Sequence, residues 1–177
     1  MIRNITLTQA IVTLMFAAIA LPAGSAIAQQ KQHVSYKSPP ENAKYTQQTI
    51  IDVGDVTGHQ VRLFEIHRVY PANQPVVNGS KLVEQWTRGS SDYIDNNGTS
   101  VTYGVYVFEN GDKFFTRSSL VAQSPAPGKL TNSVVGTITG GTGKLVGMQG
   151  VVRSTGSAEP KAGVNETQTD IDYWFNK

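Results

Sequence analysis

The chain has 177 residues, no cysteine, and a formal net charge of +2 at pH 7 from 15 basic and 13 acidic side chains. A chain without cysteine cannot form disulfides, use thiol chemistry or bind zinc through Cys ligands. The nearly balanced charge, with no stripe of basic residues, gives nucleic-acid binding no support.

The first 28 residues have the pattern of a cleaved secretory signal peptide. Arg3 is the only charge before Lys31, an apolar run extends from about residue 10 to residue 21, and Ala26-Ile27-Ala28 is an A-x-A cleavage motif. A transmembrane anchor is the alternative, but the run is shorter than the ~20 residues that a spanning helix needs. Cleavage would leave residues 29–177, with 14 basic and 13 acidic side chains. We therefore expect an exported bacterial protein, periplasmic or secreted, with no membrane span after cleavage.

Residues 29–48 are polar, contain Pro39-Pro40 and lack apolar periodicity, so a flexible leader is expected there. From residue 49 onward, runs rich in β-branched and aromatic residues alternate with turn signals, and no helical apolar repeat persists for three turns. The segment 49–177 therefore predicts one β-domain. Its expected strands cover residues 49–56, 59–70, 81–94, 99–109, 112–123, 130–141, 149–157 and 166–175.

Turn chemistry and strand spacing favour a sandwich or a barrel. Asn110-Gly111 is the strongest hairpin signal and predicts a tight turn with positive φ at both central residues. Several runs are apolar or aromatic on both faces, as in Tyr103 and Val105 beside Tyr106. Both faces of such a sheet would be buried in a closed barrel with a further segment packed on its outside, or in an oligomer.

The stretch GTITGGTGKLVGMQG, residues 136–150, could be a phosphate-binding loop or a glycine-rich β corner. A Walker A loop needs glycine five residues before Gly143 and Ser or Thr after Lys144, but Ile138 and Leu145 stand there. The dinucleotide fingerprint G-x-G-x-x-G fails as well, because Val146 stands at its sixth position. The residues therefore favour a β corner over a nucleotide site.

In such a corner each glycine has a structural task. Residues 140–143 would supply positive φ, and Gly147 and Gly150 would permit bulges or close strand approach. Leu145, Val146 and Met148 are expected to pack beneath the corner.

The stretch ITGGTGKLVGMQGVV resembles the GGTGKFxxARG hairpin of the allene oxide cyclase-like and dirigent-like barrels. The preceding FENGDKFFTRSS is similar to the strand-turn-strand of those families, and the resemblance covers about residues 80–156. It implies an eight-stranded antiparallel, calycin-type barrel with a largely apolar cavity. It also implies cyclase or isomerase activity on a reactive small molecule, and homodimers or homotrimers. The glycine hairpin is structural in those families, and no position matches the plant catalytic residues, so no site residue is carried over.

Charged and aromatic residues inside the β-runs are the candidates for chemistry. Glu84 and Arg117 are the predicted catalytic pair, and Glu65, Trp86 and Tyr103 are the predicted ligand-binding residues. A carboxylate in an apolar cavity can act as a general acid or base because burial raises its pKa. The alternative is a solvated outer face with satisfied ion pairs. Alternation along a strand does not tell which of its faces points inward.

The three histidines, His33, His59 and His67, show no metal-ligand spacing, so no metal and no other cofactor is expected. We expect an exported barrel that binds a hydrophobic or aromatic small molecule. One alternative is a cyclase or isomerase of the allene oxide cyclase or dirigent type. The other is a non-catalytic structural or interaction protein of the cell envelope.

Overall fold

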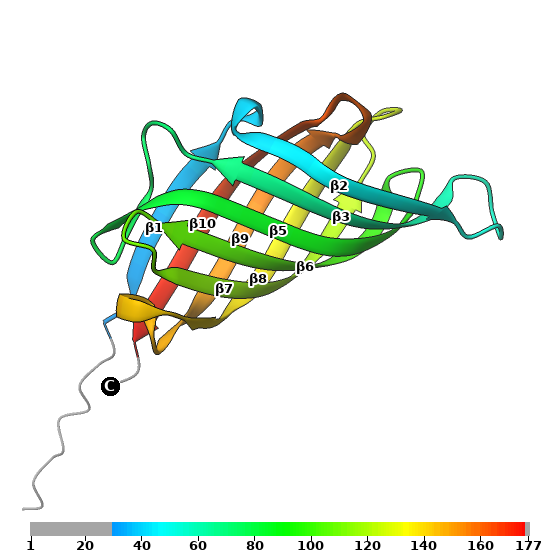
Figure 1. Cartoon of the computed structure of the whole chain (residues 1–177). Coiled ribbons are helices and arrows are strands. Elements are labelled where there is room, and N and C mark those ends of the chain that lie inside the picture. The colour runs from blue at the N-terminus through cyan, green and yellow to red at the C-terminus, as the bar shows by residue number, and fades with distance from the viewer. Residues whose placement is uncertain (1–29, 176–177) are drawn as a thin grey trace, which may run out of the picture.

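The computed structural model describes residues 30–175, which form one antiparallel β-sheet (Figure 1). The predicted signal peptide lies outside the described residues. None of the helical segments described is long and apolar enough to cross a membrane. The strands are β1 (Gln32–Ser38), β2 (Ala43–Asp52), β3 (His59–Val69), β4 (Val76–Val77), β5 (Ser80–Ile94), β6 (Asn97–Phe108), β7 (Lys113–Gln123), β8 (Leu130–Gly141), β9 (Met148–Glu159) and β10 (Val164–Phe175); the 3₁₀ turns are η1 (Pro40–Asn42), η2 (Gly143–Leu145) and η3 (Pro160–Ala162).

The prediction of an all-β, antiparallel fold is confirmed, and β2, β3 and β5 to β10 correspond to the eight expected strands. The flexible leader is wrong, because residues 29–48 contain β1, η1 and the first half of β2. β1 pairs along its whole length with β10, from Gln32 opposite Tyr173 to Ser38 opposite Thr167. This pairing across the length of the chain, rather than any local apolar repeat, orders the segment.

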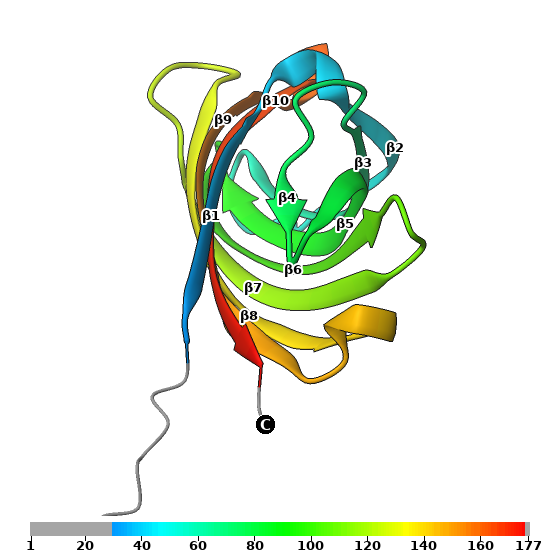
Figure 2. The same ribbon diagram turned by 90° about the vertical axis from the view of Figure 1, so that its left-hand side faces the viewer.

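The prediction of an eight-stranded closed barrel is also wrong. The sheet has ten strands in the order β1-β10-β9-β8-β7-β6-β5-β3-β2, with the short β4 beside β5, and no backbone ladder joins β1 to β2 in the part of the chain described. The sheet nevertheless curls around an interior (Figure 2). η1 leads the chain from one edge strand to the other, and a bulge between Tyr45 and Gln47 disturbs β2 near its start. Beyond that bulge β2 is exposed along its length. A side-chain hydrogen bond from Asn165 on β10 to Tyr45 on β2 reaches across the gap.

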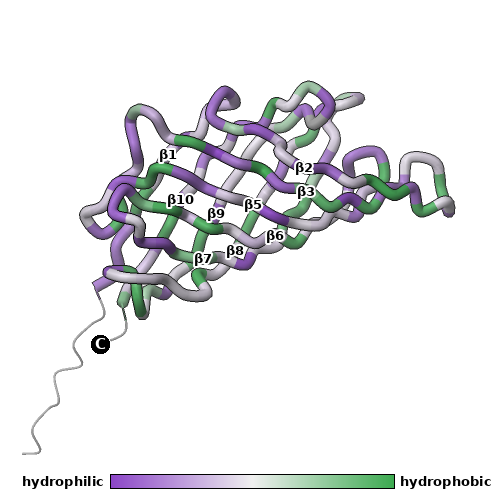
Figure 3. The backbone as a smooth tube through the Cα atoms, viewed as in Figure 1, coloured by the Kyte–Doolittle hydropathy of each residue, from purple (hydrophilic) through white to green (hydrophobic). Residues whose placement is uncertain are grey.

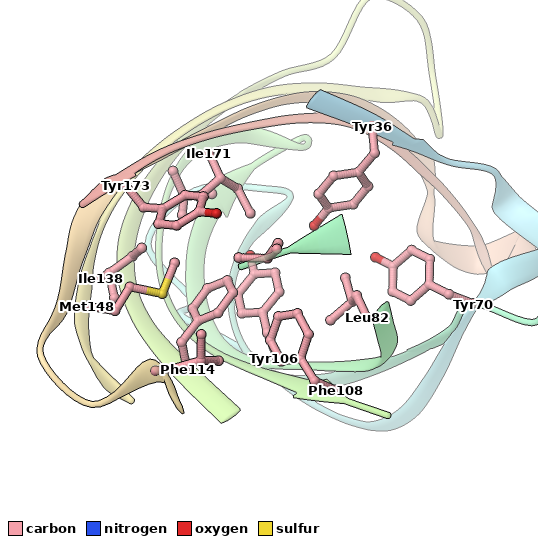
Figure 4. Packing of buried hydrophobic residues seen from close by; sticks show 13 residues of the cluster. Tyr36, Tyr70, Leu82, Tyr106, Phe108, Phe114, Ile138, Met148, Ile171 and Tyr173 are labelled. Carbon is pink, nitrogen blue, oxygen red and sulfur yellow. The ribbon is translucent and has the colours of Figure 1, made fainter. Parts of the chain in front are cut away.

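Two apolar clusters occupy the interior. The large cluster fills one end of the curl (Figure 4), and the small cluster lies toward the other. The buried members of the large cluster are Tyr36, Tyr70, Val77, Leu82, Tyr106, Phe108, Phe114, Ile138, Leu145, Met148, Val152, Ile171 and Tyr173. Those of the small cluster are Tyr93, Ala122, Leu130 and Ala158. Along the strands apolar and polar residues alternate (Figure 3), as expected when successive side chains face opposite sides of a sheet.

The glycine-rich segment is the corner between β8 and β9, and the strand β9 rather than a helix follows it. Gly143 and Gly147 have φ angles of 54° and 78°, which L-residues rarely adopt. Leu145 and Met148 are buried as predicted. Val146 is 66% exposed, so the prediction that it packs beneath the corner is wrong. It directly follows η2, whose buried side chain is that of Leu145.

The loop at Asn110-Gly111 differs from the tight turn predicted there. Between β6 and β7 only Gly111 has a positive φ, 83°, and Asn110 does not, so the two-residue turn predicted there is wrong. The Asn110 side chain instead accepts a hydrogen bond from the Asp112 backbone N–H at 3.1 Å, which holds a longer loop. The turn with positive φ at both central residues joins β5 to β6, at Asp95 (50°) and Asn96 (66°).

Candidate functional site

The five predicted site residues lie together on the outer face of the sheet, on β3, β5, β6 and β7. Strand pairing sets Glu65 opposite Arg88, Arg88 opposite Tyr103, and Tyr103 opposite Arg117, in one row across the sheet. None of the predicted residues is among those that line the interior cavity. All five predicted residues therefore face outward, away from this cavity.

One end of this row is an ion pair supported by a hydroxyl. Arg88 Nε lies 2.7 Å from Glu65 Oε2, and Thr46 Oγ1 donates to Glu65 Oε1 at 2.6 Å. The Thr46 hydrogen bond, with the charge of Arg88, holds the pKa of Glu65 below its ordinary value. Glu65 is therefore ionised in this network at neutral pH. A general acid needs a raised pKa, which Glu65 does not have.

The remaining outer-face contacts centre on Trp86. Its ring stacks on that of His67 with centroids 3.9 Å apart, and the Arg88 guanidinium lies 5.2 Å from the Trp86 ring centroid. Trp86 Nε1 donates to Glu84 Oε2 at 3.2 Å, and His67 Nε2 lies 3.3 Å from the same oxygen. These half-exposed contacts are the satisfied pairs expected of a solvated face. The catalytic roles of Glu84 and Arg117 remain predictions.

A cavity of about 110 Å³ lies inside the curl, between the two apolar clusters. Its wall combines rings and aliphatic groups, such as Phe64 and Ile66, with hydroxyl and amide groups, such as Thr87, Thr102 and Asn132. The polar groups converge because inward-facing positions recur every second residue on each strand. No Asp, Glu or His lines this cavity within the described chain.

Two arginines of β3 face this cavity. Arg62 and Arg68 flank Phe64 and Ile66 on the inner face of the strand, and Arg68 is only 4% exposed. Arg68 donates to the Asn165 amide oxygen through Nη2 and lies 3.5 Å from Thr87 Oγ1 through Nη1. The Nε atoms of both arginines are buried, and neither has a hydrogen-bond partner among the residues described. The interior therefore contains positive charge that no carboxylate of its wall offsets.

Tyrosines beside Arg68 do not supply the missing negative charge. Burial raises the pKa of the Tyr36, Tyr70 and Tyr106 hydroxyls, so all three are neutral at pH 7. The Tyr70 hydroxyl donates to Gln85 Oε1 at 2.9 Å and lies 3.0 Å from Ser38 Oγ. The tyrosine hydroxyls near Arg68 therefore offer it no negative charge.

The cavity adjoins a second, open depression of about 710 Å³ at the end of the sheet. The two share Arg62, Ser91 and Tyr93 in their walls. Asp95 and Lys161 are the other charged residues around the depression, which the loop 124–128 completes. The shared residues place Arg62 at the neck between the depression and the cavity. Because the large cluster fills the opposite end, this depression is the mouth of the cavity.

Alternation along residues 59–70 places Arg62 and Arg68 on one face with Phe64 and Ile66. The predicted site residue of this strand, Glu65, lies on the opposite face. The signal that could have identified the inner face is the pair of arginines among large apolar and aromatic residues. An arginine side chain at such a position either extends its guanidinium to the solvent or buries its charge. The choice between these needed the direction of the curl, which strand alternation does not contain.

Comparisons with protein-family models, curated proteins and solved structures found no match to this chain. The resemblance to the allene oxide cyclase-like and dirigent-like barrels therefore stays a prediction. Within residues 30–175, no group of three His, Asp or Glu side chains could hold a metal ion. Fold and site together define a curled antiparallel sheet around a small cavity whose wall mixes apolar groups, neutral polar groups and two arginines.

Proposed function

We propose that this protein binds a small molecule inside its curled sheet. The observation that supports the proposal is the cavity itself, where rings and aliphatic groups meet a limited set of hydroxyl, amide and guanidinium groups. Ligand sites in proteins have this composition, in which apolar walls provide contact area and a few polar groups fix orientation.

The size of the cavity restricts the ligand. Sites for drug-sized molecules enclose about 300–1,000 Å³, whereas this cavity encloses about 110 Å³. The ligand is therefore compact, of the size of one aromatic ring with a polar substituent. Phe64, Tyr93 and Tyr106 offer aromatic surface to such a ring, in accord with the expectation of an aromatic ligand.

A cavity-filling substitution tests this function. Thr102 lines the cavity and is 7% exposed, whereas Thr99 lies three residues earlier on β6 and is exposed. Thr102→Phe should fill the space where the ligand binds, and Thr99→Phe adds the same side chain on the outside. Protein purified without denaturation from an exporting bacterial host would be examined by native mass spectrometry. We expect a retained small mass in the wild type and in Thr99→Phe, and its loss in Thr102→Phe.

The same variants can then be titrated with ring-sized compounds and followed by thermal unfolding. A ligand that binds only the folded protein raises its stability by mass action. Equal binding by Thr102→Phe and Thr99→Phe, both folded, would reject the cavity as the site.

Binding is favoured over the alternative of a cyclase or isomerase. Acid–base catalysis inside the cavity would use carboxylates or imidazoles of its wall, and Glu84 and Arg117 lie on the other side of the sheet. If the protein is such an enzyme through these residues, Glu84→Gln and Arg117→Gln abolish turnover of the retained compound while the protein stays folded. Unchanged turnover in both variants removes them from the site.

A second function, association with another copy of the chain, is favoured by the ribbon of β2 and β3. Every residue from Thr46 to Asp52 is exposed, and Ile51 and Leu63 are 62% and 60% exposed. An unpaired edge strand with apolar residues on it is a template for pairing with a further strand. We propose a homodimer through this edge.

A periplasmic or secreted location, the remaining part of the proposal, rests on the residue pattern of the N-terminus, and sequencing the N-terminus of the exported protein tests it.

A further inference from the structure

We propose that the ligand of the interior cavity is a compact organic anion, a small carboxylate, which Arg68 binds at the inner end and Arg62 admits at the neck. This inference rests on the proposed function and adds the chemical class of the ligand.

The first step is the charge of Arg68. A guanidinium stays protonated in proteins and carries five N–H donors. Only two of these have a partner among the described residues, the Asn165 amide oxygen and the Thr87 hydroxyl, and the buried Nε has none. A buried charge without a counter-charge is costly. Because the cavity wall lacks Asp and Glu, the counter-charge must come from outside the described chain.

The second step is geometry. A guanidinium offers parallel N–H groups that match the two oxygens of a carboxylate, and such a bidentate pair is stronger than a neutral hydrogen bond. The hydroxyl and amide groups around the cavity can donate to the same oxygens. Inorganic phosphate would use the same donors, so the experiment below separates it from a carboxylate.

The third step is the position of Arg62. Arg62 lies six positions before Arg68 on β3, which is about 20 Å of extended strand. Arg62 lies where the cavity meets the open depression, whereas Arg68 lies toward the large cluster. In the described chain the Arg62 side chain makes no salt bridge and no hydrogen bond, and its Nε is buried. A charge at the neck attracts an anion on its way in, and a charge at the inner end holds it.

The probes are two matched pairs, benzoate with benzamide and acetate with acetamide, together with inorganic phosphate. Each amide has nearly the shape of its acid but lacks the charge. Binding to the full exported chain would be measured by calorimetry at constant ionic strength, and association rates by stopped flow. We expect benzoate to bind at least about tenfold more tightly than benzamide, because hydrogen bonds to charged groups are the stronger ones, and phosphate to bind more weakly than benzoate.

The variants separate the two arginines. Arg68→Met keeps an unbranched apolar stem and removes the guanidinium, and should weaken benzoate binding at least about tenfold. Arg62→Gln should mainly slow association and flatten its salt dependence. Arg153→Gln is the matched control, because Arg153 lies on the outer face of β9 in an exposed pair with Asp172. Circular dichroism and thermal unfolding establish that each variant is folded; if Arg68→Met fails to fold, Arg62→Gln still decides.

Each outcome bears on the inference in a definite way. A preference for carboxylates that falls in Arg62→Gln and Arg68→Met, but not in Arg153→Gln, supports it. Equal binding of acids and amides, or carboxylate binding that persists in both cavity variants, overturns the anion site while the proposed function stands. Tighter binding of phosphate than of benzoate overturns the assignment to carboxylates. Failure of every probe to bind, with Thr102→Phe also without effect on the retained mass, overturns the inference and the proposed function together.

Discussion

Asn165 on β10 accepts a hydrogen bond from the Arg68 guanidinium on β3, across the interior of the sheet. The amide nitrogen of the same residue donates to the Tyr45 hydroxyl on β2 at 3.2 Å. One amide thus joins β10 to β2 and β3 at the place where β1 and β2 share no backbone ladder. Side-chain hydrogen bonds therefore connect the two edges of the curl.

Replacing this amide by a carboxylate supplies the missing counter-charge. Asn165→Asp retains size and shape and sets a carboxylate oxygen where the amide oxygen accepts from Arg68. We expect the free energy of unfolding to rise by about 1–2 kcal/mol, because a hydrogen bond between two charges replaces one to a neutral acceptor. Chemical denaturation checks the stability. Calorimetry with benzoate should show weaker binding, since Arg68 is then neutralised.

Asn165→Ala is the opposite change and serves as the control. It leaves another Arg68 donor and the Tyr45 hydroxyl without their partner, and should lower the free energy of unfolding by about 1–3 kcal/mol. If Asn165→Asp were no more stable than Asn165→Ala, the bond between Arg68 and Asn165 would not contribute in the way described.

The limits of the sequence prediction follow from the same region. Local turn signals and alternation located eight strands, because each run of residues 49–175 is bounded by residues that break strands. β1 escaped notice because its order comes from pairing with β10, whose sequence lies more than a hundred residues away. The prediction of a closed barrel was wrong for a related reason. The exposed end of β2 has the sequence pattern of an ordinary strand, and this pattern does not tell whether the strand has a partner on both sides.

The sequence separates the two faces of each strand, but it does not tell which face lines the interior and carries the site. The pattern of β3 separates Glu65 and His67 from Arg62 and Arg68, and nothing in the pattern indicates the direction of the curl. The expectation of a carboxylate inside an apolar cavity selected Glu65 from the first face. In the fold, Glu65 has an outer partner in Arg88 within 2.7 Å, while the arginines of the inner face meet no carboxylate.

His59 is expected to make stability depend on pH. Its Nε2 lies 2.7 Å from Asp92 Oδ1 and its Nδ1 lies 2.6 Å from Asp55 Oδ1. The hydrogen bond to Asp92, followed by that to Asp55, raises the pKa of His59 above its ordinary value of 6.5. A group with a raised pKa in the folded state stabilises that state fully below its ordinary pKa. This contribution disappears as the pH rises through the raised value.

The measurement compares the wild type with His59→Asn by chemical denaturation at about pH 5.5 and about pH 8.5. The difference in stability should be larger at the lower pH, and NMR titration of the His59 ring should give a midpoint above 6.5. Asp92→Asn should bring that midpoint down. A midpoint that does not move in Asp92→Asn would contradict the assigned cause.

The glycine corner predicts a difference between two glycines with similar backbones. A Cβ at Gly143 would lie 1.7 Å from Asp112 Oδ1, whereas a Cβ at Gly111 meets nothing within 4 Å. Gly111→Ala should cost only the left-handed backbone strain, about 1–2 kcal/mol. Gly143→Ala should cost roughly twice as much, because Asp112 must also move. Urea denaturation of both variants gives the two values.

Asp112 makes this comparison sharper. Its Oδ2 accepts the backbone N–H of Lys144 at 3.0 Å, which fixes the carboxylate against the corner. With Asp112→Ala already present, Gly143→Ala should cost no more than Gly111→Ala, since the clashing atoms are gone. An unchanged penalty in the double variant would place the strain in the backbone alone.

The exposed ribbon of β2 and β3 predicts a dimer with twofold symmetry. An antiparallel pairing of two β2 edges is closed, so each copy uses the same strand and assembly stops at two. Ile51→Lys adds a charge to the edge strand of each copy, and should give monomers by sedimentation equilibrium. Val135→Lys, at a residue 58% exposed on β8, is the control and should leave the dimer intact. A monomeric wild type would reject the association. A trimer would reject the twofold edge, since three copies cannot close through one antiparallel pair of strands, and would place the contact on a surface other than β2.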